Sequence, residues 1–97
     1  MEYRFEWDEK KNTTNKEKHG VSFDEALLIF NDPNRFEFFD KKHSFFEDRW
    51  TAVGLNSTTV LRVCFTEKNG SIRIISVRKA DKKEEEKYFY GYSTKNN

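Results

Sequence analysis

Glu47 and Arg49 are the two residues whose types and spacing best fit phosphodiester chemistry. They stand two positions apart in segment 46–55, whose pattern predicts a strand, so both side chains are expected on one face. A carboxylate there can accept a proton, and a guanidinium can bind phosphate oxygens. The same spacing also fits an exposed ion pair, which contributes little to stability. Spacing alone leaves both interpretations open.

Arg78 and His19 are further candidates, each with a structural alternative. Arg78 leaves the end of a predicted strand beside Lys79, where it can clamp a phosphate or simply contact the next helix. His19 stands between Lys18 and Gly20 at a predicted helix end. The helix dipole favours an imidazolium there, which is a structural explanation, while an imidazole is also the usual general acid or base.

Cys64 and His43 are expected to play no chemical part. Cys64 lies in the apolar run 59–66 and is predicted to pack in the core, and His43 lies in a polar turn and is predicted to be exposed. One cysteine and two histidines argue against a dedicated zinc site, so we expect no metal and no cofactor. The sequence contains neither a Gly-rich phosphate loop nor a nucleophile elbow.

The composition is polar and yet rich in aromatic residues. Of the 97 residues, 36% are charged and 35% hydrophobic, but 10 Phe, 4 Tyr and 2 Trp can supply much of a core. The length fits one domain and excludes large two-lobed enzymes. No run approaches the roughly 20 apolar residues of a membrane span, and no secretory signal is visible, so we expect a cytoplasmic protein without membrane association. A single cysteine fits that compartment.

Charge is unevenly distributed along the chain. The net charge is +1, but residues 58–97 hold nine Lys and Arg against five Asp and Glu. This excess fits a surface that faces a polyanion, and equally a solvated face.

The elements that must position these residues are predicted in the order β-α-α-β-β-β-β-α. Segment 8–19 contains no apolar side chain, yet Asp8 and Gly20 are typical helix caps, so this helix is either loosely held or uses its polar face. Ser22 and Glu25 form a capping box for a second helix. That helix is predicted to bury the stripe Phe23, Ala26, Leu27 and Phe30.

The remaining chain predicts a meander of strands followed by a helix. Strands are expected at 3–7, 35–39, 46–55, 59–66 and 71–79, with a hairpin at Asn69-Gly70 and a last helix over 81–90 capped by Asp81. Tight turns between consecutive strands predict an antiparallel sheet and an α+β fold. Alternation in the last strand predicts one face with Ile72, Ile74, Ser76 and Arg78 and another with Arg73, Ile75 and Val77.

Three blocks of this sequence resemble the BrnT toxin family. The first contains Trp7-Asp8, Lys11-Asn12, Asn15, Lys18-His19-Gly20-Val21, Phe23 and Ala26. The second is Glu47-x-Arg49. The third contains Ile74-Ile75-Ser76, Arg78, Ala80, Glu84 or Glu85, and Tyr88. Together they span nearly the whole chain in order.

The resemblance implies a ribonuclease toxin of a bacterial type II toxin–antitoxin system. It implies a RelE-like fold, with a small antiparallel sheet, two N-terminal helices and one C-terminal helix. It also implies RNA as substrate, arrest of translation, and neutralisation by a BrnA antitoxin with a ribbon-helix-helix part, in a heterotetramer. DNA is then reached through the antitoxin alone. On this basis residues 1–90 form the toxin domain, and 91–97 are expected to be a loose tail.

The resemblance also suggests roles for the candidates. RNA can be cut without a metal by its own 2′-hydroxyl, which needs a base, an acid and positive charge on the phosphate. Glu47 is the candidate base and His19 the acid, or the two exchange roles. Arg49 and Arg78 stabilise the charge that develops on phosphate oxygens. Substrate binding is assigned to Lys18, Asn15 and Tyr88.

A module that binds RNA or protein without cutting is the main alternative. A toxin that has decayed to antitoxin binding is another. Neither needs His19 or Glu47, whereas a nuclease does.

Overall fold

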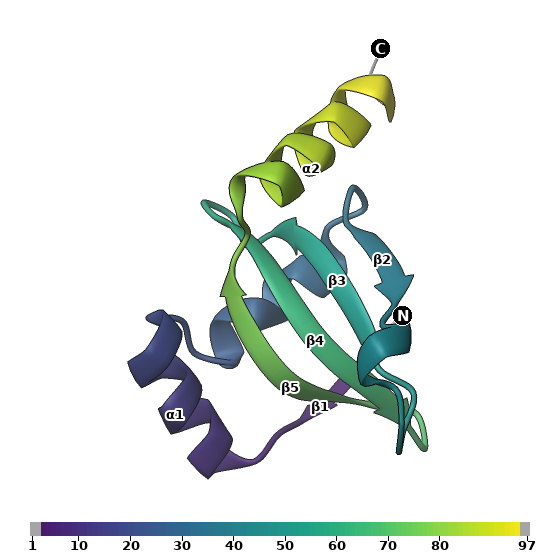
Figure 1. The fold of residues 1–97 in the computed structure, drawn as a ribbon. Coiled ribbons are helices and arrows are strands. Elements are labelled where there is room, and N and C mark those ends of the chain that lie inside the picture. Colours follow the sequence, from purple (N-terminus) through teal and green to yellow (C-terminus); the bar gives the residue numbers. More distant parts are fainter. Residues whose placement is uncertain (1–2, 96–97) are drawn as a thin grey trace.

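A computed structural model describes residues 3–95, which form five strands, two α-helices and two 3₁₀ helices (Figure 1). In chain order they are β1 (Arg4–Glu6), α1 (Glu9–His19), η1 (Asp24–Asn31), β2 (Phe36–Phe39), η2 (Lys41–His43), β3 (Trp50–Leu55), β4 (Val60–Lys68), β5 (Ser71–Lys79) and α2 (Lys82–Lys95). The predicted α+β class is confirmed, and the likeness to the RelE fold stays a prediction. None of the helices in the described part is long and apolar enough to cross a membrane.

The strands form one sheet in the order β1-β5-β4-β3-β2. The three pairs β2–β3, β3–β4 and β4–β5 are antiparallel, as predicted, and the β4–β5 hairpin turns at Asn69 and Gly70, whose φ values are 53° and 80°. The prediction of a wholly antiparallel sheet is wrong, because β1 lies parallel to β5 with Arg4 opposite Ser71. Helices separate β1 from the other strands, so no tight turn constrains its direction.

The main core lies on one face of this sheet, between the strands and η1 (Figure 1). The second predicted helix is a 3₁₀ helix over Asp24–Asn31. Its three residues per turn bring Ile29 into the core with Phe23 and Ala26, and leave Leu27 only half-buried. The other core residues are Val21, Phe30, Ala52, Leu61, Val63, Phe65, Ile72, Ile74 and Val77.

Helix α1 has no apolar face and is held by its asparagine side chains. Asn15 is buried, with 7% exposure. Its Nδ2 donates to the carbonyls of Val77 at 2.8 Å and Val21 at 2.9 Å, and its Oδ1 accepts from the Val77 amide at 3.2 Å. The Asn12 Oδ1 accepts from the Phe23 amide at 2.8 Å. The end of α1 that carries His19 is thereby fixed beside β5.

A β-bulge at Ile75 decides which face Arg78 occupies. Ile74 pairs with Phe65 and Ser76 with Cys64, so Ile75 has no partner in the register. The bulge shifts the alternation by one residue, and Val77 continues the buried row of Ile72 and Ile74. The prediction that Ser76 and Arg78 share a face with Ile72 and Ile74 is therefore wrong. Both lie on the opposite face, which we call the open face.

The ends of two predicted elements also differ. Strand β3 begins at Trp50 and not at 46, because the Asp40 amide donates to the Arg49 carbonyl at 2.8 Å and closes a loop over residues 41–48. Helix α2 begins after Asp81 as predicted but continues to Lys95. The predicted loose tail at 91–97 thus begins inside a helix, and residues 96–97 lie outside the described part.

Candidate functional site

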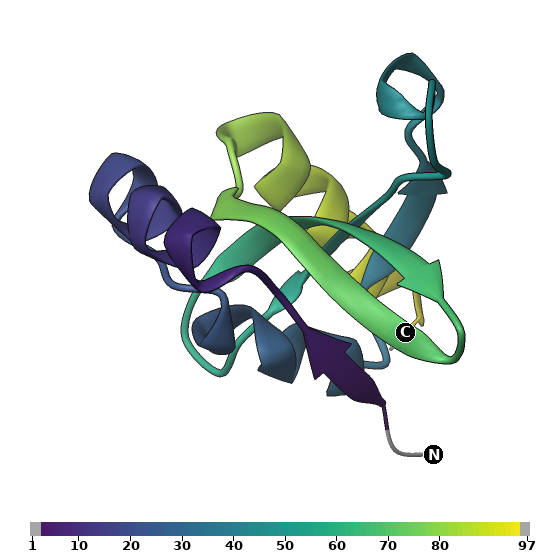
Figure 2. The same cartoon turned by 90° about the horizontal axis from the view of Figure 1, so that it is seen from below.

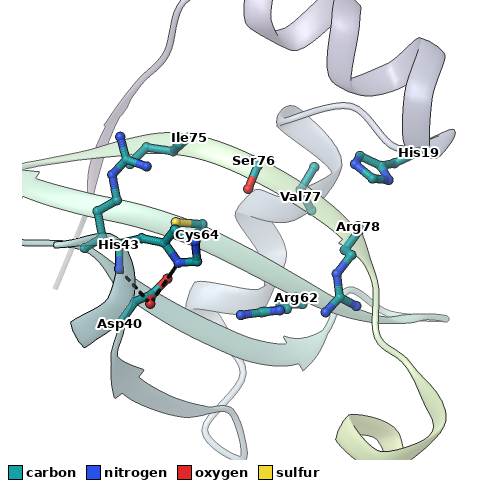
Figure 3. A pocket seen from close by; sticks show the side chains of 10 residues that line it. His19, Asp40, His43, Arg62, Cys64, Ile75, Ser76, Val77 and Arg78 are labelled. Atoms are coloured by element: carbon teal, nitrogen blue, oxygen red, sulfur yellow. Dashed lines mark hydrogen bonds and ion pairs between the residues drawn. The ribbon is translucent and has the colours of Figure 1, made fainter. Parts of the chain in front are cut away.

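A cavity of about 300 Å³ lies on the open face of the sheet (Figure 3). Its walls come from the end of α1, the η2 loop, the segment before β3, and strands β4 and β5. The lining residues are His19, Asp40, His43, Arg49, Arg62, Cys64, Ile75, Ser76, Val77 and Arg78. Three of the four predicted catalytic residues, His19, Arg49 and Arg78, are brought together here.

Arg62 and Arg78 lie opposite each other on β4 and β5. Like charges in such a pair repel each other, and Glu84 offsets this repulsion. Its carboxylate accepts from Arg78 Nη1 at 3.0 Å and Nη2 at 3.2 Å, and lies 3.5 Å from Arg62 Nε. Glu84 also accepts from the Asp81 amide at 2.9 Å, completing the N-terminal cap of α2. The start of α2 therefore fixes both guanidinium groups at the cavity.

Arg49 completes a set of three guanidinium groups at the cavity. It contacts Glu47 at 3.5 Å, which is longer than an ordinary hydrogen bond. Its Nε is buried and has no hydrogen-bond partner among residues 3–95. A guanidinium with donors left over at a cavity wall is suited to an anion with several oxygens, such as a phosphate.

His43 and Asp40 form a hydrogen-bonded pair at the cavity wall. His43 Nδ1 lies 3.1 Å and 3.0 Å from the two carboxylate oxygens of Asp40. A carboxylate beside Nδ1 favours the tautomer with hydrogen on that nitrogen, which leaves Nε2 as a proton acceptor. Figure 3 shows His43 with Asp40 on one side of the cavity and His19, from the end of α1, on the other. Two imidazoles thus border one cationic cavity.

Glu47 does not line this cavity. Its two oxygens accept from Arg73 Nη2 at 2.7 Å and 2.9 Å, and it lies beside Arg49. Glu47 and Arg49 precede β3 rather than lying within it, so the strand argument for their common orientation does not apply. They do contact each other, in a loop. The Glu47 carboxylate thus contacts both Arg73 and Arg49, and it is in a position to orient the Arg49 side chain.

The prediction that Cys64 packs in the core is wrong. The residue alternates with Val63 and Phe65, which fill the core, so it points to the open face and lines the cavity half-buried. Burial raises the pKa of its thiol. Nearby Arg49 and Arg62 act in the opposite direction without reversing the shift of this pKa. The neutral thiol is therefore the form present near pH 7.

A comparison with protein families finds a match over most of the chain. The model of the family described as the ribonuclease toxin BrnT of a type II toxin–antitoxin system matches residues 7–84. The chain belongs to the BrnT family. A search of curated proteins finds no match. The matched segment contains every residue that lines the cavity, together with Glu84.

BrnT membership implies a type II toxin with ribonuclease activity and an antitoxin partner. The resemblance stated from the three sequence blocks is thereby confirmed. Of the three residues predicted to bind substrate, Lys18 lies with Asn15 and His19 around a second, more open cavity along α1. Asn15 and Tyr88 are buried, and the Tyr88 hydroxyl donates to Asp32 at 2.5 Å.

Sequence reasoning missed His43, Asp40 and Arg62, which line the cavity of this candidate site. His43 is exposed, as predicted, but the same exposure places it at the cavity. The spacing of Asp40 and His43, three residues apart around a short 3₁₀ turn, was the available signal. Arg62 had a signal too, because alternation along β4 places it on the same face as Cys64.

Proposed function

We propose that this chain is a metal-independent endoribonuclease that cuts RNA through attack of the 2′-hydroxyl on the adjacent phosphate. One observation carries the proposal: two imidazoles border a cavity lined by three arginines. Such a set contains the base, the acid and the positive charge that this reaction needs. Cleavage of cellular RNA arrests translation, and the cytoplasm is where the chain meets that substrate.

His43 is the proton acceptor in this scheme. Its Nε2 takes the proton from the 2′-hydroxyl while the oxygen attacks phosphorus, and Asp40 steadies the imidazolium that forms. His19 gives a proton to the departing 5′-oxygen. The products are a 2′,3′-cyclic phosphate and a 5′-hydroxyl end, so atoms and charges balance. The two imidazoles exchange roles if the RNA runs in the other direction.

The arginines act on the phosphate. Charge builds on its two non-bridging oxygens as the 2′-oxygen adds, and fixed guanidinium groups of Arg49, Arg62 and Arg78 stabilise that charge. Because Glu84 already orients Arg62 and Arg78, little reorganisation is needed when the phosphate arrives.

The other predicted residues support this set. Glu47, the base predicted from sequence, has both oxygens bound to Arg73, so we give it a positioning role toward Arg49. Lys18 is exposed near His19 and suits the RNA backbone. Asn15 positions the end of α1, and Tyr88 anchors α2, so both act at a distance from the RNA.

The partner proposed is a BrnA-type antitoxin with a ribbon-helix-helix part. Type II membership supports an antitoxin, and the resemblance supports its type and a heterotetramer. DNA is reached through that antitoxin. Co-expression of toxin and antitoxin followed by light scattering tests the stoichiometry, and a complex with another ratio of chains contradicts it.

The test is cleavage of labelled RNA by the purified protein in EDTA. We expect cyclic-phosphate ends, suppression by antitoxin, and losses of about 10²–10⁴-fold for His43→Ala and for His19→Ala. Arg4→Ala, an exposed arginine on β1, is the control and should cleave like the wild type. Full dependence on added metal contradicts the mechanism.

Glu47→Gln separates the two candidate bases. Loss of positioning is expected to lower the rate without moving the pH profile. If Glu47→Gln abolishes the acidic limb of that profile, where protonation inactivates the base, while His43→Ala retains it, Glu47 is the base. Binding of RNA with no cleavage, and no growth arrest on expression, supports the binding-module alternative.

A further inference from the structure

Phe45 and Phe46 project into solvent from the loop between η2 and β3. They are 87% and 95% exposed, the highest values among the exposed large hydrophobic residues of the described chain. Their rings are in edge-to-face contact, with centroids 4.9 Å apart. Two adjacent aromatic side chains left in water are unfavourable in an isolated protein, which suggests that something covers them.

The loop that carries the two rings is firmly closed. The Ser44 hydroxyl donates to the Asp40 carbonyl at 2.5 Å and accepts from the Arg49 amide at 2.9 Å. The Thr66 hydroxyl on β4 donates to the Asp48 carbonyl at 2.7 Å. These bonds fix both ends of the segment with the rings between them. Figure 2 shows this segment, at the end of β2, standing clear of the rest of the fold.

The rings adjoin the cationic cavity. A smaller cavity of about 270 Å³ is lined by Lys42, His43, Phe45, Phe46, Glu47 and Arg49. It shares His43 and Arg49 with the main cavity. A ligand that places a phosphate beside Arg49 therefore brings its neighbouring groups to the two rings.

We propose that Phe45 and Phe46 form a stacking platform for an unpaired base of the RNA, next to the phosphate that is cut. The inference rests on the proposed function for the identity of the ligand. A nucleotide joins a flat π-face to an anion, and this loop pairs aromatic rings with Lys42, His43 and Arg49. An apolar protein segment fits the rings but not these cations. The base must be unpaired, because a duplex hides its faces.

The experiment measures binding of a short single-stranded RNA whose 2′-hydroxyls are replaced by fluorine, so that it cannot be cut. We expect Phe45→Ala/Phe46→Ala to raise Kd by about tenfold or more. Phe89→Ala, which removes a 48% exposed ring on α2 outside both cavities, is the matched control and should bind like the wild type. Circular dichroism checks that each variant is folded.

Abasic nucleotides separate stacking from other effects. Removing bases from the RNA should weaken binding to the wild type by a similar factor and cause no further loss in the double variant. If the double variant binds RNA normally but loses affinity for the antitoxin, the rings are a protein-docking surface and the proposal is overturned. Binding is measured on an RNA that cannot be cut, so the result does not depend on catalysis. If the two rings stack bases but the protein cleaves no RNA, the nuclease proposal fails and the stacking proposal stands.

Discussion

Replacing Asn15 tests how a helix without an apolar face is held on this fold. Asn15→Ala removes three hydrogen bonds to buried backbone groups, two of them to Val77. Each such bond contributes about 1 kcal/mol net, so we expect the free energy of unfolding to fall by about 3 kcal/mol. A domain of this size has about 5–15 kcal/mol in total, so the variant stays folded at 25 °C.

The assay is urea denaturation followed by tryptophan fluorescence, together with a thermal melt. A loss of about 3 kcal/mol corresponds to a drop in Tm of roughly 15 °C for a domain of this length. Thr14→Ala, one residue earlier on the exposed side of α1, is the control and should change stability by less than about 0.5 kcal/mol. If Asn15→Ala unfolds within 1 kcal/mol of the wild type, the asparagine does not anchor α1, and the account of how His19 reaches the cavity fails.

Three further predictions follow from the contacts around the site. Glu84→Gln should lower the free energy of unfolding by about 1 kcal/mol or less, since the ion pair with Arg78 is partly exposed. It should slow cleavage several-fold at unchanged RNA affinity, and cleavage at the wild-type rate contradicts the positioning role of Glu84. Burial raises the pKa of the Cys64 thiol above 9.0, so the thiol should react slowly with iodoacetamide at pH 7.5 and faster above pH 9.0. The free energy of unfolding should correspondingly fall as the pH rises past 9.0. Rapid alkylation at neutral pH refutes this prediction. Burial raises the pKa of Asp32, but hydrogen bonds from Tyr88 and nearby amides outweigh burial and leave this pKa below 3.8. Tyr88→Phe should therefore lower the free energy of unfolding by about 1 kcal/mol at pH 7, and by less in acid, where the wild type also loses this stability. A loss that does not shrink in acid contradicts the assignment.

Local patterns in the sequence were sufficient for much of the fold. Caps at Asp8 and Gly20, the hairpin at Asn69-Gly70 and the cap at Asp81 are all present, because each depends on neighbouring residues alone. The parallel pairing of β1 depends on residues far along the chain, so no local pattern indicated it.

The candidate site was predicted in part for the same reason. Residue types suggested His19, Arg49 and Arg78, and all three line the cavity. The bulge at Ile75 was invisible, because a one-residue insertion in a strand leaves no mark in the alternation of an apolar run. His43 was set aside as exposed, although exposure is also what a site on a loop requires.

The parallel pairing of β1 with β5 has a consequence for biosynthesis. Strand β1 can pair only after β5 has been synthesised, since Arg4 lies opposite Ser71. The cavity likewise gains Arg78 and the His19 end of α1 only when β5 has joined the sheet, and Glu84 orients Arg78 only when α2 has begun. Contacts so distant in the chain form late, after the intervening segment has left the ribosome. A nascent chain therefore has no assembled cavity, and no activity from it, until β5 and the start of α2 have been made.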